Sequence, residues 1–206
     1  MRALSQLSDL VILNLLTLLC CVPVVTAGAS FAAMHYCLIR MHEGTDGSIP
    51  QLFFREFKGN FKKATCSWLL LLAIALVLFI DNRIMGSVTA KIGGLWRGAF
   101  FAGIAVASAW ALYVFPLHAR FENSVTGTWK NAGILALAFL PRTLGMLVIE
   151  GVLLFLFTQV TSLLPLFFLL GFSLAGFLRG YLYLPVLKKI AGEGGAKAEE
   201  TEETDE

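Results

Sequence analysis

Long apolar stretches without charge set the pattern of this chain. Residues 10–39, 64–80 and 98–117 contain no Asp, Glu, Lys or Arg, and 143–178 contains only Glu150. About 20 apolar residues are needed to cross a bilayer as a helix. The pattern therefore predicts an all-α, polytopic transmembrane helical bundle of about five spans, with a sixth left open. The predicted spans lie near 10–39, 64–82, 97–118, 143–162 and 165–187.

The first predicted span is longer than a bilayer requires and is interrupted. Pro23 removes a backbone hydrogen bond and Gly28 loosens the helix, so we expect a broken or kinked first helix. Arg2 and the small residues near Ala27 also resemble a secretory signal. The polar Asn14 inside the run, and the uncharged sequence that continues to residue 39, favour a retained span.

Composition supports a bilayer as the surroundings of this chain. Apolar residues make up 57% of it and charged residues 15%, too little polar surface for a soluble domain of this size. We expect contact with lipid and none with nucleic acid.

Basic residues are divided unevenly between the two sides of a five-span arrangement. Of the sixteen Lys and Arg, only Arg2, Arg83, Lys91 and Arg97 fall on one side. Cytoplasmic loops carry the excess of positive charge. The count predicts a multi-pass membrane protein with the N-terminus outside and the C-terminus cytoplasmic.

Two further segments are predicted outside the spans. After Gln51, aromatic and cationic residues alternate at helical spacing and include Phe57, Lys58, Phe61 and Lys62, which indicates an amphipathic helix in the cytoplasmic interface. The simpler alternative is a positive-inside anchor for the next span. Residues 192–206 are rich in Glu and nearly free of apolar side chains, which predicts a disordered acidic tail.

No pattern of residues indicates a reaction. The sequence has no nucleophile, base or metal cluster at a recognisable spacing, so we expect no catalytic residues, no metal, no cofactor and no enzyme activity. The intramembrane charges Glu150 and Arg179 are the sharpest candidates, because charges inside a membrane are costly. They form either an ion pair that pins two helices or, with Asn14, a substrate or ion path.

Several motifs together resemble the YesL-like family of small bacterial integral membrane proteins. They are Pro23-Val24-Val25-Thr26-Ala27-Gly28, Phe57-Lys58-Gly59-Asn60-Phe61-Lys62-Lys63, Tyr113-Val114-Phe115-Pro116-Leu117 and Lys130-Asn131-Ala132. The resemblance implies a protein of a bacterial plasma membrane with five or six spans, an unassigned biochemical function, and genes beside those of carbohydrate ABC importers. It implies no catalytic or binding residues.

The resemblance leads to a functional hypothesis with an alternative. ABC permeases carry a Glu-Ala-Ala…Gly…Leu-Pro loop that docks on the ATPase. In this chain Glu122 and Pro141 have a similar spacing. However, Asn123 and Ser124 replace the two alanines, and Gly127 comes one position early. We therefore expect a non-enzymatic accessory or scaffold component that contacts ABC sugar permease or ATPase subunits, with homo-oligomers left open. The alternative is a stand-alone small-solute transporter or channel that uses the broken first helix with Glu150 and Arg179.

Overall fold

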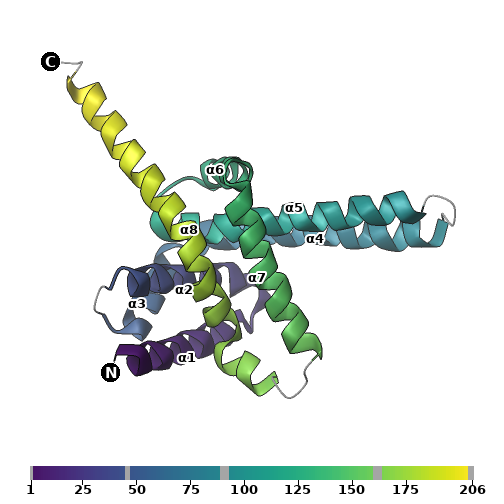
Figure 1. The fold of residues 1–206 in the computed structure, drawn as a ribbon, viewed down its shortest axis with the longest axis horizontal. Coiled ribbons are helices and arrows are strands. Elements are labelled where there is room, and N and C mark those ends of the chain that lie inside the picture. The colour runs from purple at the N-terminus through teal and green to yellow at the C-terminus, as the bar shows by residue number, and fades with distance from the viewer. Residues whose placement is uncertain (1, 45–46, 89–92, 160–163, 204–206) are drawn as a thin grey trace.

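A computed structural model describes residues 2–44, 47–88, 93–159 and 164–203 of the chain. All regular structure in these ranges is helical, which confirms the predicted all-α fold (Figure 1). The elements are α1 (Arg2–Cys21), the short 3₁₀ helix η1 (Val24–Thr26), α2 (Ala27–His42), α3 (Ile49–Gly59), α4 (Phe61–Val88), α5 (Gly93–Arg120), α6 (Val125–Ala138), α7 (Leu140–Gln159) and α8 (Leu164–Glu203).

Several of these helices are long and apolar enough to cross a membrane. The described residues contain four such helices, at Val24–His42, Phe61–Ile84, Trp96–Arg120 and Pro165–Gly192, or five if the bent pair α6 and α7 counts as one span. The predicted spans 64–82, 97–118 and 165–187 fall inside three of them. The chain is a multi-pass helical membrane protein.

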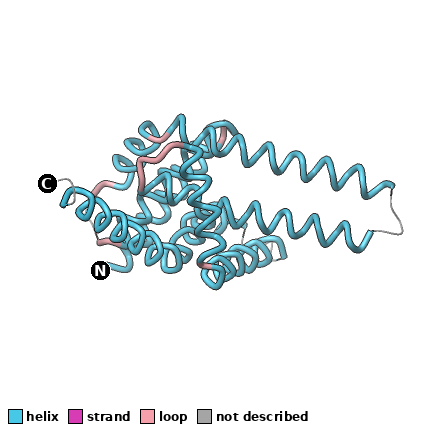
Figure 2. Tube along the Cα trace, turned by 90° about the horizontal axis from the view of Figure 1, so that it is seen from above, coloured by secondary structure: helices cyan, strands magenta, loops and turns pink. Residues whose placement is uncertain are grey.

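Helices α4 and α5 form a long arm that projects from the rest of the bundle (Figures 1 and 2). Only 11% of the most apolar part of α4 is buried within the protein, and large side chains such as Val77, Phe79 and Phe101 are more than half exposed. In water such a surface would be unstable. Lipid therefore covers most of the arm.

The stretch 10–39 folds as a helical hairpin, which corrects the prediction of one broken span. Helices α1 and α2 lie side by side and run in opposite directions (Figure 1). The Ser30 hydroxyl donates to the Thr17 carbonyl oxygen at 3.0 Å, and the Thr26 hydroxyl donates to the Cys20 carbonyl oxygen at 2.6 Å. Pro23 ends the helical hydrogen bonding, and these side chains then satisfy carbonyl groups at the turn.

A close approach fixes the hairpin against α4 of the long arm. Gly28 is buried, and a Cβ atom at this position would collide with the Ala64 carbonyl oxygen and the Trp68 Cβ atom of α4. The Trp68 indole N–H donates to the Val24 carbonyl oxygen at 2.7 Å. Only glycine permits this contact between α2 and α4.

The predicted span 143–162 begins after a sharp bend. Helices α6 and α7 meet at 97°, and the Thr143 hydroxyl donates to the Ala136 carbonyl oxygen at 2.9 Å. Pro141 has no N–H to continue the hydrogen bonding of α6, which explains the break. The end of this predicted span, at residues 160–162, lies outside the described residues.

Helix α8 continues through Gly192 to Glu203 (Figure 1). This differs from the disordered tail predicted for 192–206. Ala, Glu and Lys are strong helix formers, so the tail composition permits a helix to extend from one that is already packed. Residues 204–206 lie outside the described part.

Candidate functional site

A cavity of about 270 Å³ lies where five helices converge. Its walls are largely aromatic: the Phe31 ring centroid lies 5.8 Å from that of Trp68, 5.6 Å from that of Phe115 and 5.7 Å from that of Phe172. Polar side chains from α2, α5, α7 and α8 also line it, namely His35, Ser108, Glu150 and Arg179. We call this space the central cavity.

The two intramembrane charges singled out from the sequence meet in the central cavity. Arg179 Nη1 lies 2.7 Å from Glu150 Oε2, and Arg179 Nε donates to the Ala175 carbonyl oxygen at 3.1 Å. A charge at the centre of a membrane helix costs roughly 2.5–3.5 kcal/mol on the insertion scale. Pairing offsets part of this cost and joins α7 to α8.

The pair is unequally buried, and this asymmetry matters for chemistry. The Arg179 side chain is 12% exposed, whereas the Glu150 side chain is 50% exposed. Since Arg179 accounts for one carboxylate oxygen, the other side of the carboxylate remains available to a molecule in the cavity. The arrangement can bind a charged or hydrogen-bonding group beside an aromatic wall.

Two histidines, the buried His35 and the half-buried His42, extend the polar network around α8. His35 Nδ1 lies 3.3 Å from the Tyr183 hydroxyl, and His42 Nε2 donates to the Phe177 carbonyl oxygen at 3.0 Å. The third histidine, His118, lies 2.8 Å from the Ser67 hydroxyl. The described residues contain no group of three His, Cys, Asp or Glu side chains positioned to hold a metal ion.

Asn14 is buried away from the central cavity and binds the backbone of α8. Its side-chain NH₂ donates to the Phe168 carbonyl oxygen at 2.7 Å, while its carbonyl oxygen accepts from the N–H groups of Phe172 and Ser173 at 3.0 and 3.1 Å. Figure 1 shows α8 bending near its start. An amide inserted between backbone partners is a recognised cause of such bends. The geometry gives Asn14 a structural role and does not bring it together with Glu150.

The predicted interfacial helix packs against protein as well as membrane. Phe53 of α3 is fully buried, and Phe57 packs against the same cluster between α1, α2 and α3. Lys58 and Lys62 are exposed, and Phe61 is 36% exposed. The buried aromatic rings therefore hold α3 on the bundle, and the exposed lysines remain available to the surroundings.

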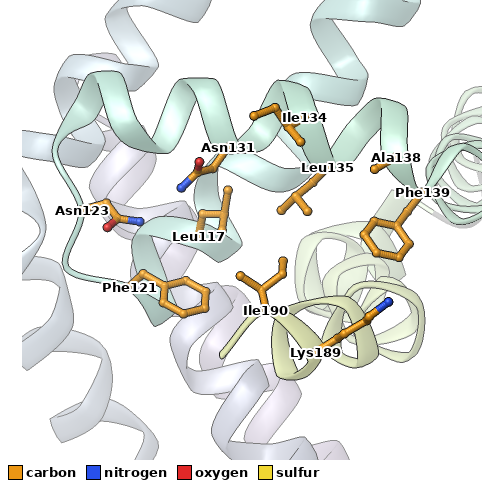
Figure 3. Close-up of a pocket in the computed structure, with 10 residues that line it drawn as sticks. All are labelled: Leu117, Phe121, Asn123, Asn131, Ile134, Leu135, Ala138, Phe139, Lys189 and Ile190. Carbon is orange, nitrogen blue, oxygen red and sulfur yellow. The ribbon is translucent and has the colours of Figure 1, made fainter. Parts of the chain in front are cut away.

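A second hollow, of about 330 Å³, borders the segment that was compared with a docking loop. Its apolar lining includes Leu117, Leu135 and Ile190, and its polar residues are Asn123, Asn131 and Lys189 (Figure 3). We call it the α5–α6–α8 groove. Glu122 and Pro141 are exposed but do not line it.

Sequence reasoning missed the α5–α6–α8 groove. Its residues are separated by up to 73 positions, from Leu117 to Ile190, and no spacing rule joins them. The only sequence signal was indirect, since the segment 122–141 drew attention for a different reason.

Comparison with known proteins finds similarity to proteins without an assigned function. Residues 10–82, from α1 into α4, match the family described as protein of unknown function, DUF624. The chain is 26% identical over 166 residues to the uncharacterized protein YteU of Bacillus subtilis (strain 168), which covers 80% of this chain and 72% of that protein. No solved structure matches the chain. These matches agree with the resemblance to YesL-like proteins.

Proposed function

We propose that this helical membrane protein, which carries a DUF624 region of unknown function, is a non-enzymatic accessory component of a carbohydrate ABC importer. The observation that carries the proposal is the α5–α6–α8 groove, an apolar hollow with polar groups at its rim. Specific interfaces commonly seat one apolar anchor of the partner in such a pocket. The partner would be an ATPase or permease subunit.

The position of the groove supports a partner on the cytoplasmic side. It lies at the end of the bundle where Lys188, Lys189 and Arg120 are found, and positive charge favours the cytoplasm. Because α1 and α2 form a hairpin, the start of α1 and the basic segment after α2 lie at the same end. We infer that α1 crosses the membrane as well as α2, so that the number of crossings is even and both termini are cytoplasmic, in place of the outside N-terminus predicted from the sequence.

Affinity purification of the tagged chain from its native bacterial membranes, followed by mass spectrometry, tests the proposal. We expect stoichiometric recovery of a carbohydrate ABC permease or its ATPase. A pure chain without either subunit, under conditions that preserve other membrane complexes, contradicts the accessory function.

Two matched substitutions on α6 locate the contact. Ile134 lines the groove and is 62% exposed, whereas Leu137 lies outside it and is 72% exposed. Ile134→Arg should abolish recovery of the partner, and Leu137→Arg should preserve it, because a snorkelling Arg is tolerated at a membrane surface. Equal recovery with both variants argues against the groove as the contact.

The second candidate function is a small-solute transporter or channel. It is favoured by one observation, the half-exposed Glu150 carboxylate facing the central cavity. Glu150→Gln distinguishes the two functions: it should abolish uptake by a transporter, whereas for an accessory protein it should lower stability without affecting recovery of the importer from the protein that remains folded.

A further inference from the structure

A third hollow, distinct from the α5–α6–α8 groove, adjoins the central cavity along the arm of α4 and α5. It measures about 380 Å³ and is lined by apolar residues of α4 and α5, among them Leu72, Ala75, Phe79 and Ile104. Trp68, Ser108 and Ala111 line both this hollow and the central cavity. The two spaces are therefore adjacent sections of one depression, apolar along the arm and polar at its inner end.

The dimensions of the apolar section fit one hydrocarbon chain. From Trp68 to Phe79 the α4 wall extends by about 16 Å at the helical rise of 1.5 Å per residue. This is close to half of the roughly 30 Å thickness of a bilayer core, which is the depth of one leaflet. An acyl chain of a membrane lipid has this length and this chemistry.

The polar section offers one charge of each sign. Arg179 donates to Ala175 and Glu150, but a guanidinium has five N–H donors in a planar fork that suits phosphate. Glu150 is half exposed beside Arg179, and a carboxylate accepts hydrogen bonds from an ammonium group. The aromatic wall of Phe31 and Trp68 adds a surface that attracts cations.

We propose that this depression is a binding site for one zwitterionic, amine-bearing phospholipid of the phosphatidylethanolamine type. Its phosphate binds Arg179, its ammonium binds Glu150, and one acyl chain lies in the groove between α4 and α5. A choline headgroup has no N–H to donate, and a glycerol headgroup has no positive charge for Glu150. The proposal does not depend on the accessory function.

The test uses the full-length protein purified from vesicles that contain equal parts of phosphatidylethanolamine, phosphatidylglycerol and phosphatidylcholine, with retained lipids counted by native mass spectrometry. We expect one retained phosphatidylethanolamine, favoured about tenfold over each of the other lipids, because a charge-assisted hydrogen bond contributes on that scale. Equal retention of the three lipids overturns the headgroup assignment.

Variants test the two sections separately. Ala75 lines the groove between α4 and α5, and Ala73 does not. Both are exposed, so neither substitution repacks the bundle. Ala75→Phe should lower phosphatidylethanolamine retention about tenfold, and Ala73→Phe should leave it unchanged. The double variant Glu150→Gln with Arg179→Gln, which leaves no unpaired charge, should lose the headgroup preference. Unchanged retention in Ala75→Phe, or an equal loss in Ala73→Phe, overturns the site.

Discussion

The amide of Asn14 gives the sharpest prediction for stability. It is fully buried on α1 and makes three hydrogen bonds to the backbone of α8, at 2.7, 3.0 and 3.1 Å. Leu has a similar branched shape but no polar group, so Asn14→Leu removes all three bonds while it keeps the space filled. The variant leaves α8 two alternatives, and each has a cost.

In the first alternative α8 keeps its bend, and three backbone groups lose their side-chain partner. In the second, α8 straightens so that Phe172 N–H returns to the Phe168 carbonyl, and the start of α8 moves away from α1. Hydrogen bonds between membrane helices average about 0.6 kcal/mol each. Three of them amount to about 2 kcal/mol.

Thermal unfolding in mild detergent measures this effect, with the loss of monodisperse protein as the readout. A loss of about 2 kcal/mol lowers the melting temperature by about 4–8 °C for a chain of this size. Leu15→Ala is the control, because Leu15 is the next residue on α1 and is 49% exposed. If Asn14→Leu melts at the temperature of the unmodified protein, α8 forms equally good bonds without the amide and the reasoning is refuted.

Three further predictions concern packing, charge and topology. Gly28→Val should destabilise the protein by about 1–3 kcal/mol, since overpacking against Ala64 shifts backbone; denaturation of the purified variant measures it, and a neutral result contradicts the close approach. Glu150→Gln should be more destabilising than Arg179→Gln, because it leaves the more deeply buried partner unpaired; the melting temperatures of the two variants compare them, and the reverse order contradicts this. Reporter fusions at the two termini, one active only in the cytoplasm and one only outside, should place both ends in the cytoplasm; ends on opposite sides contradict the hairpin topology.

The sequence predicted the two helices of the long arm well, because the hydropathy of a lipid-facing helix does not depend on its neighbours. The predicted spans 64–82 and 97–118 lie within α4 and α5 for this reason. The hairpin of α1 and α2 was not predictable in the same way. Pro23 is compatible with either a kink or a reversal, and the choice depends on distant contacts such as that of Trp68 with Val24.

The candidate sites, too, could be predicted from the sequence only in part. Glu150 and Arg179 stood out because charges in apolar stretches are rare, and the structure brings them to 2.7 Å. The aromatic wall of the central cavity was hidden, since Phe31, Phe115 and Phe172 look like ordinary packing residues. Asn14 stood out because it is polar. Its partner, however, is the backbone of α8, and since every sequence has the same backbone groups, no residue pattern could have identified this partner.

Polar contacts are distributed along α8 so that its neighbours α1, α2 and α7 are each fixed by one of them. Asn14 of α1 binds at residues 168–173, His42 of α2 binds at Phe177, and Glu150 of α7 binds at Arg179. Apolar burial discriminates poorly between helix partners in lipid, because lipid chains are as apolar as leucine. A buried polar side chain finds few alternative hydrogen-bonding partners, so these contacts select one position of α8 among many similar apolar packings. Since α8 lines both the central cavity and the α5–α6–α8 groove, the same contacts that order the bundle also set the shape of its two candidate sites.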